Sequence, residues 1–171
     1  MNDDEAFEQL QIAVQNQQHG PGKIAKLAQD GFDLNYSPLP QHPVFLAIAF
    51  HHFNIVNALI DHGLRFDHRD PQHQNASLIQ RLRSQRDFFE GFVNSPDHKE
   101  SRSIIKRRLQ GTLQAIEKYD RLVAAGTIAP IEDAPEQTGA ELADQLEEKL
   151  KDIPGMQEAM QALLNNLRNE S

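Results

Sequence analysis

The fold is decided by residues 42–67, HPVFLAIAFHHFNIVNALIDHGLRFD. Pro43 suits the first position of a helix, where its missing N–H would have no partner anyway. Apolar residues recur behind it at helical spacing, pause over the polar residues 51–54, and then recur with the same spacing. Gly63 follows, where a left-handed residue closes a last helical turn at low cost. The stretch therefore predicts two short helices and a tight turn. We expect these positions to face inward: Val44, Ala47, Ile48, Ile55, Val56, Leu59 and Ile60.

A hairpin of two such short helices cannot bury its apolar faces alone and needs similar neighbours. The preceding residues supply one. Residues 3–17 form a moderate amphipathic helix, residues 17–22 are a turn cluster rich in glycine and glutamine, and residues 23–29 predict a second helix. This helix ends before Gly31, which lies 32 residues ahead of Gly63. That spacing is close to the period of about 33 residues found in one class of helical repeat.

The two stretches resemble ankyrin repeats residue by residue. His42-Pro43-Val44-Phe45-Leu46-Ala47 takes the place of the family's Thr-Pro-Leu-His-x-Ala, and residues 55–67 are similar to Ile-Val-x-x-Leu-Leu-x-x-Gly-Ala-Asp-x-Asn. Residues 31–35 repeat the end of the second motif. His42 departs from the capping Thr, and His51 departs from the usual Gly between the helices. The resemblance covers about residues 5–83 well and residues 84–126 loosely.

The resemblance implies an all-α, ankyrin-like stack of antiparallel helical hairpins, with repeats at residues 5–36 and 37–68 and a divergent third at residues 69–126. In the third, Ser77 caps a helix that runs to about Val93. Ser95-Pro96 begins another, whose apolar stripe continues until Gly126. The length of these two helices points to an insertion from roughly Gln85 to Arg102.

The C-terminal part lies outside the resemblance. Residues 127–137 have the composition of a linker. Thr138 and Glu141 then form a capping box at the start of an amphipathic helix, and Pro154-Gly155 separates it from another. We expect residues 138–171 to be a helical hairpin that caps the stack. Homo-oligomerisation through these helices and a recognition helix for a partner are the alternatives.

Composition limits the function. The net charge of −8 argues against general nucleic-acid binding, which needs a basic footprint. The acidic N-terminus does not resemble a signal peptide, and the longest apolar run, residues 44–50, is too short for a bilayer. The chain contains no cysteine, which fits a reducing compartment. We expect a soluble cytoplasmic protein without membrane contact, or one acting in a host cytoplasm if it is a delivered effector.

Histidine is the one residue type that suggests chemistry. Six of the eight histidines fall within residues 42–73: His42, His51, His52, His62, His68 and His73. A zinc site needs three or four ligands converging on one point, whereas these positions scatter over the repeat. Catalytic and phosphate-binding motifs are absent. We therefore expect no catalytic residues, no metal site and no cofactor. The alternative is a metal-binding protein or metal-dependent hydrolase that uses this histidine cluster.

The family binds proteins with its projecting fingers and the exposed side of its inner helices, so the resemblance implies a scaffold or adaptor that binds a protein partner through this concave surface. An apolar centre rimmed by His, Asp and Arg would have the anatomy of a binding hot spot. We expect that centre to be formed by Tyr36, Leu39, Phe50 and Leu82. The other members of the surface are Pro38, Gln41, Ala49, His68, Asp70, His73 and Arg81.

Charge is spread unevenly along the chain. Residues 81–108 contain eight Lys or Arg and four acids, while residues 132–170 contain ten acids and three bases. Solvated faces, or attraction between the two regions, explain this simply. The functional alternative is that the basic helical hairpin steers an acidic partner.

Overall fold

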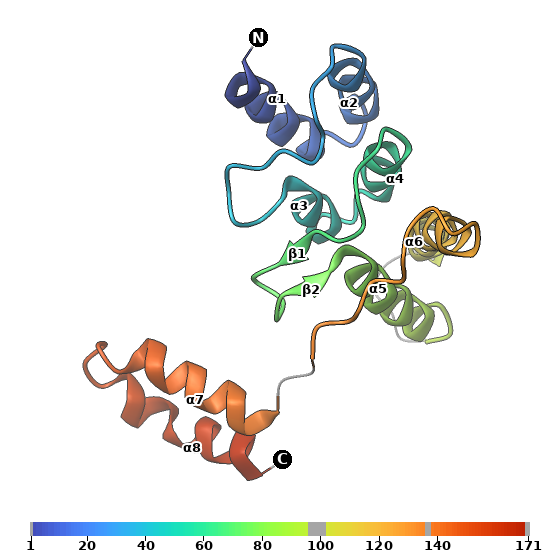
Figure 1. Cartoon of the computed structure of the whole chain (residues 1–171). Coiled ribbons are helices and arrows are strands. Elements are labelled where there is room, and N and C mark those ends of the chain that lie inside the picture. The colour runs from blue at the N-terminus through green and yellow to red at the C-terminus, as the bar shows by residue number, and fades with distance from the viewer. Residues whose placement is uncertain (1, 96–101, 136–137, 170–171) are drawn as a thin grey trace. The chain divides into compact units, whose positions relative to one another are not determined.

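The computed structural model describes residues 2–95, 102–135 and 138–169, and it divides into two compact units, Met1–Ala134 and Pro135–Ser171. Most of the described residues are helical, which confirms the all-α class (Figure 1). Strand structure in the described ranges is confined to one antiparallel pair, β1 (Arg69–Asp70) and β2 (Ala76–Ser77).

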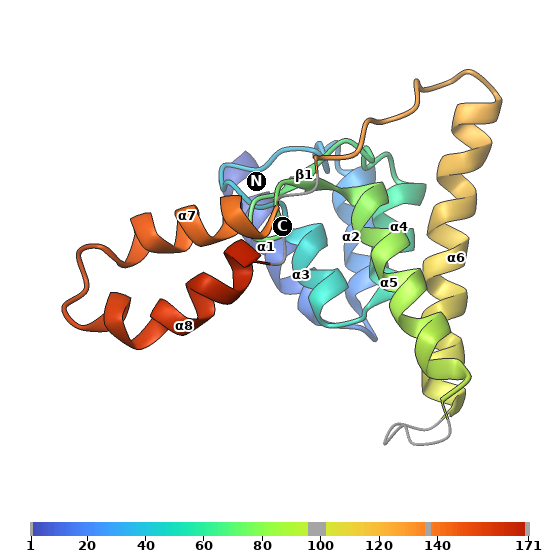
Figure 2. The same cartoon turned by 90° about the horizontal axis from the view of Figure 1, so that it is seen from below.

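The first unit contains three successive pairs of packed helices. In each pair the two helices contact one another, and the pairs are linked by contacts of α1 with α3 and of α4 with both α2 and α6. Figure 2 shows that the ends of α5 and α6 project past the shorter helices of the unit. The pairs are α1 (Asp3–Gln15) with α2 (Gly20–Gln29), α3 (Pro43–Ala49) with α4 (Phe53–Asp61), and α5 (Leu78–Val93) with α6 (Arg102–Ala124).

A polar side chain caps the first helix of each pair. The Asn2 side chain accepts a hydrogen bond from the Glu5 N–H at 2.8 Å, and the Glu5 carboxylate accepts one from the Asn2 N–H at 3.1 Å. The two bonds form a capping box at the start of α1. The Ser77 hydroxyl accepts from the Gln80 N–H at 3.2 Å, as the sequence predicts for α5. His42 fills the position where the family carries Thr: its Nδ1 accepts from the Val44 N–H at 3.1 Å.

The second helix of each pair ends in the same way. Gly31, Gly63 and Gly126 have φ values of 88°, 100° and 69°, the left-handed conformation that glycine adopts without strain. After each glycine, a backbone N–H reaches back to the helix. The three bonds are Phe32 N–H to Leu27 O (3.0 Å), Leu64 N–H to Leu59 O (2.9 Å) and Thr127 N–H to Leu122 O (2.9 Å).

One continuous hydrophobic core runs through the three pairs. The inward positions predicted in residues 42–67 are buried, except for the half-buried Ile60. This burial supplies the main favourable term in folding, because apolar area is removed from water. The largest fully buried side chains include Leu10, Ile24, Phe45, Leu59, Leu78, Leu82 and Phe89.

Two boundaries differ from those expected. Helix α2 begins at Gly20, because Pro21 fits its first turn, so the turn before it is shorter than predicted. Residues 127–134 are not a free linker but belong to the first unit. The Tyr119 hydroxyl accepts from the Ile131 N–H at 2.9 Å, and the Gln80 side chain bonds both backbone groups of Ala134. Pro96, which was expected to start the sixth helix, lies outside the described residues.

The second unit is a helical hairpin of α7 (Gly139–Leu150) and α8 (Met156–Asn169). Thr138 and Glu141 form the predicted capping box. Ala143 and Leu164 are buried in its small interior, and Arg168 of α8 pairs with Asp144 at 3.0 Å and with Glu147. The apolar spacing predicts that Ile153 continues the apolar face of α7, but this helix ends at Leu150 and Ile153 follows it.

Candidate functional site

We call the first helix of each pair, α1, α3 and α5, the inner helix. Two loops, called fingers below, precede the inner helices α3 and α5 (Figure 1). The first finger, residues 36–41, contains no regular structure. The second finger, residues 69–77, is a short hairpin in which Arg69 pairs with Ser77 and Asp70 pairs with Ala76. Gln74 and Asn75 turn the chain with φ values of 53° and 57°, a conformation that few residue types other than glycine and Asn adopt easily.

Asp70 organises the second finger. Its carboxylate is fully buried and accepts hydrogen bonds from Gln72 N–H (3.1 Å) and His73 Nδ1 (2.8 Å). Gln41 of the first finger donates to the same carboxylate at 2.8 Å. Arg81 of α5 places its Nε 3.1 Å from Asp70 Oδ2; the N–H is poorly aligned, so the contact is better described as an ion pair than as a hydrogen bond. Both fingers and α5 are thus tied to one buried charge.

His42 and Asn35 join the two segments that lead into the fingers, residues 34–35 and residues 63–68. The His42 ring is buried, with its Nε2 2.8 Å from Leu34 O and its centroid 4.4 Å from the centroid of the His68 ring. Burial lowers the pKa of His42 to about 4, so the ring is neutral near pH 7. Asn35 Oδ1 accepts from the Arg65 N–H at 2.8 Å and from His68 Nε2 at 3.0 Å.

A shallow cavity of about 330 Å³ lies between the fingers and the inner helices α1 and α3. Leu39 and Gln41 of the first finger, and Pro71 and Gln72 of the second, form its rim. The Leu39 side chain is 48% exposed. The cavity therefore offers apolar and amide contacts to a bound molecule. It contains no pair of groups arranged for acid–base or nucleophilic chemistry among its lining residues.

The structure brings together most of the residues expected on the binding surface, but many serve the fold. Tyr36 is half-buried between Phe7 and Phe32, and its hydroxyl donates to the Asp4 carboxylate at 2.9 Å. His68 and Arg81 are half-buried in the contacts described above. The exposed positions among them are Pro38, Leu39, Ala49, Phe50 and His73.

Two of the expected surface residues are not on the surface at all. Leu82 is fully buried, because it lies on the same face of α5 as Leu78, Ile79 and Phe89, so its place in an exposed apolar centre is wrong. Asp70 is also inaccessible to a partner. Phe50 is exposed, but it follows α3 at the end remote from Leu39 and lines a different cavity.

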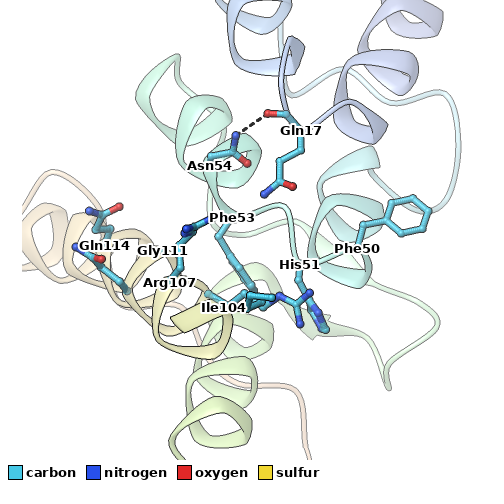
Figure 3. A pocket seen from close by; sticks show the side chains of 11 residues that line it. Gln17, Phe50, His51, Phe53, Asn54, Ile104, Arg107, Gly111 and Gln114 are labelled. Carbon is cyan, nitrogen blue, oxygen red and sulfur yellow. Dashed lines mark hydrogen bonds between the residues drawn. The ribbon is translucent and has the colours of Figure 1, made fainter. Parts of the chain in front are cut away.

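That second cavity has a volume of about 480 Å³ (Figure 3). Its lining comes from three places: Gln17 in the α1–α2 turn, residues 50–54 around the α3–α4 turn, and one side of α6. Asn54 Nδ2 donates to Gln17 O at 2.8 Å and holds two of these together. Sequence reasoning missed this site. The basic run in residues 81–108, which contains Arg107 and Arg108, was its one signal.

The clustered histidines have separate structural contacts. His42 and His68 are in contact with their rings tilted at 37°, His73 bonds Asp70, and His52 Nδ1 lies 3.1 Å from Val14 O. His51 has a φ of 58° and stacks on Phe53. In the part of the chain that the structure describes, no three His, Asp or Glu side chains are grouped to hold a metal ion.

None of the helices in the described ranges combines the length and apolar character needed to span a lipid bilayer. Comparison of the chain with protein-family models, with curated protein sequences and with solved structures gave no match.

Proposed function

We propose that the first unit is an ankyrin-like repeat module that binds a protein partner through its fingers and inner helices and acts without catalysis. The observation that carries this proposal is the Gln41–Asp70–Arg81 network. It fixes two fingers at their base while Leu39 remains 48% exposed on the rim between them.

The repeated helix ends support a stack of three related units. Gly31, Gly63 and Gly126 share a left-handed conformation. Each glycine N–H donates to the carbonyl three residues before it, and the next N–H donates to the carbonyl five residues before it. The first two glycines are 32 residues apart and the last two are 63 apart, so the third pair carries about one extra repeat length. The long α5 and α6 accommodate that extra length. Such a stack builds one extended face from successive repeats.

Rigid fingers also suit binding energetically. Ordering a loop on association costs free energy, and a loop that is already fixed avoids much of that cost. Asp70 fixes the second finger, and Asn35 holds the segment that leads into the first finger through bonds to Arg65 and His68. The exposed Pro38 and Leu39 then present apolar contact area on a preorganised support. A partner surface with a complementary apolar patch fits this face.

Site-specific photo-crosslinking tests the proposal. A benzophenone amino acid replaces Leu39 in the protein produced in its own cells, and the control carries it at Lys23, which is exposed on α2, outside the proposed surface. Crosslinked proteins are identified by mass spectrometry, purified and titrated against the unmodified chain. The proposal predicts a partner that is captured from position 39 but not from position 23, and that binds in solution. Equal capture from both positions, or no binding by the purified protein, would refute it.

A further inference from the structure

The second cavity lies where α6 runs past the end of the α3–α4 pair. Helix α6 contacts α4 at Gly111, whose carbonyl accepts from Asn57 Nδ2 at 2.9 Å. Toward its N-terminus, α6 leaves the shorter helices and projects beyond them (Figure 2). The space between the projecting part and the α3–α4 turn is the cavity of about 480 Å³.

The described residues that line this cavity carry a charge opposite to that of the whole chain. The described lining residues include Arg107 and Arg108, and none of the described lining residues is acidic. The chain as a whole carries a net charge of −8. Arg107 is exposed, and no carboxylate in residues 2–95, 102–135 or 138–169 forms an ion pair with it. A basic cavity in an acidic protein favours an acidic ligand and lowers the affinity of basic ones.

The other lining residues indicate which groups a ligand should carry besides its carboxylate. Phe50 and Ile104 are 50% and 41% exposed at the edges, and the buried Phe53 forms an apolar floor. Amide side chains, including Asn54 and Gln114, lie beside them and can exchange hydrogen bonds with a peptide backbone. Figure 3 shows Phe50, Phe53 and Asn54 around the α3–α4 turn and Ile104, Arg107 and Gln114 along α6. An apolar side chain and a carboxylate can therefore be bound together.

We propose that this cavity, distinct from the finger surface, binds a short acidic segment of a protein partner, with a bulky apolar side chain between Phe50 and Ile104 and a carboxylate on Arg107. A nucleic acid is the weaker candidate. Two arginines beside an apolar floor do not form the extended basic track that a phosphate backbone needs, and the rest of the chain repels a polyanion. The proposal does not depend on the function of the fingers.

Selection from random peptides displayed on phage tests the ligand chemistry. The full chain is the bait, and the Arg107→Glu variant is used for counter-selection. The expected peptides carry Asp or Glu next to Leu, Ile, Phe or Trp. A synthetic peptide of the enriched sequence is then titrated by fluorescence polarisation. Failure to enrich any peptide, or enrichment of peptides without acidic residues, would overturn the proposal.

Variants that alter the net charge equally separate the cavity from a general charge effect. Arg107→Glu should weaken binding of the enriched peptide by at least about tenfold, while Lys23→Glu, on the exposed side of α2, should leave it within about twofold. Ile104→Ala should weaken it without changing any charge, and circular dichroism verifies folding. Equal weakening by Arg107→Glu and Lys23→Glu would contradict the site. So would displacement of the peptide by a single-stranded oligonucleotide that binds more tightly.

Discussion

Gly111 of α6 lies directly against Phe53 of α4: a Cβ atom at position 111 would stand 2.7 Å from the Phe53 Cβ, closer than side chains normally approach. The absence of a side chain lets the two helices meet, and Asn57 strengthens the contact by donating to the Gly111 carbonyl. This contact attaches the third helical pair to the second.

The substitution Gly111→Ala should therefore lower the free energy of unfolding by about 1–3 kcal/mol, because the helices must separate to fit the new methyl group. Gly91→Ala in α5 is the control, since no atom lies near its added Cβ. There the gain in helix propensity should stabilise the protein by about 0.5–1 kcal/mol. Urea unfolding of both variants measures the difference, and equal stability of the two would argue against a close α4–α6 contact.

The buried charge of Asp70 leads to a second prediction. Asp70→Asn leaves Arg81 without its anion and weakens the bonds from Gln41 and His73, so the free energy of unfolding should fall by about 2–4 kcal/mol. In Asp67→Asn, the lost ion pair with Arg65 is exposed and should matter by less than about 1 kcal/mol. Chemical denaturation compares them. A small effect of Asp70→Asn would mean that the fingers are not held by this network.

His42 makes stability depend on pH. Its pKa is about 4 in the folded protein and near 6.5 when unfolded, so the unfolded state takes up a proton first as the pH falls. The shift corresponds to about 3 kcal/mol of stability that is present above pH 6.5 and is lost progressively down to about pH 4. The lowered pKa of His68 acts in the same direction.

Urea unfolding between pH 7.5 and pH 4.5 checks this expectation. His42→Thr introduces a residue whose hydroxyl can also cap α3 and removes the titrating ring, so the stability of this variant should fall less steeply with acid than that of the wild type. His62→Thr changes an exposed histidine and serves as the control. Parallel slopes for the wild type and His42→Thr would contradict a buried, neutral His42.

Leu59 tests the packing between the pairs. Its side chain is fully buried in the common core, so Leu59→Ala should lower the free energy of unfolding by about 2–5 kcal/mol. Ile12→Ala, at a half-exposed position on α1, should change it by less than about 0.5 kcal/mol. Thermal and urea unfolding give both values. A near-zero effect at Leu59 would place it outside the core.

Much of the fold could be predicted because its signals are local. Glycines such as Gly31 and Gly63 mark helix ends through backbone conformation, and Ser77 and Thr138 mark helix starts through hydrogen bonds to nearby N–H groups. The apolar spacing in residues 42–67 then indicates which faces turn inward. These features depend on neighbours a few residues away.

The candidate site was less predictable because burial depends on distant segments. Leu82 has an ordinary position in a helical pattern, and only the packing of α5 shows that it is covered. The sequence alone indicates that Asp70 is an exposed polar residue of the finger. Its burial depends on contacts with Gln41 and Arg81, which are distant in sequence. The cavity at Arg107 requires α6 to pass the α3–α4 turn, which no local pattern specifies.

Amide chemical-shift mapping with the crosslinked partner tests the central claim most directly. If the fingers and inner helices bind it, the largest changes on titration should fall on residues 36–41 and 69–77, and Leu39→Ala should weaken binding without altering the free energy of unfolding. Changes confined to α2 or to residues 138–169, with the finger amides unmoved, would contradict the account.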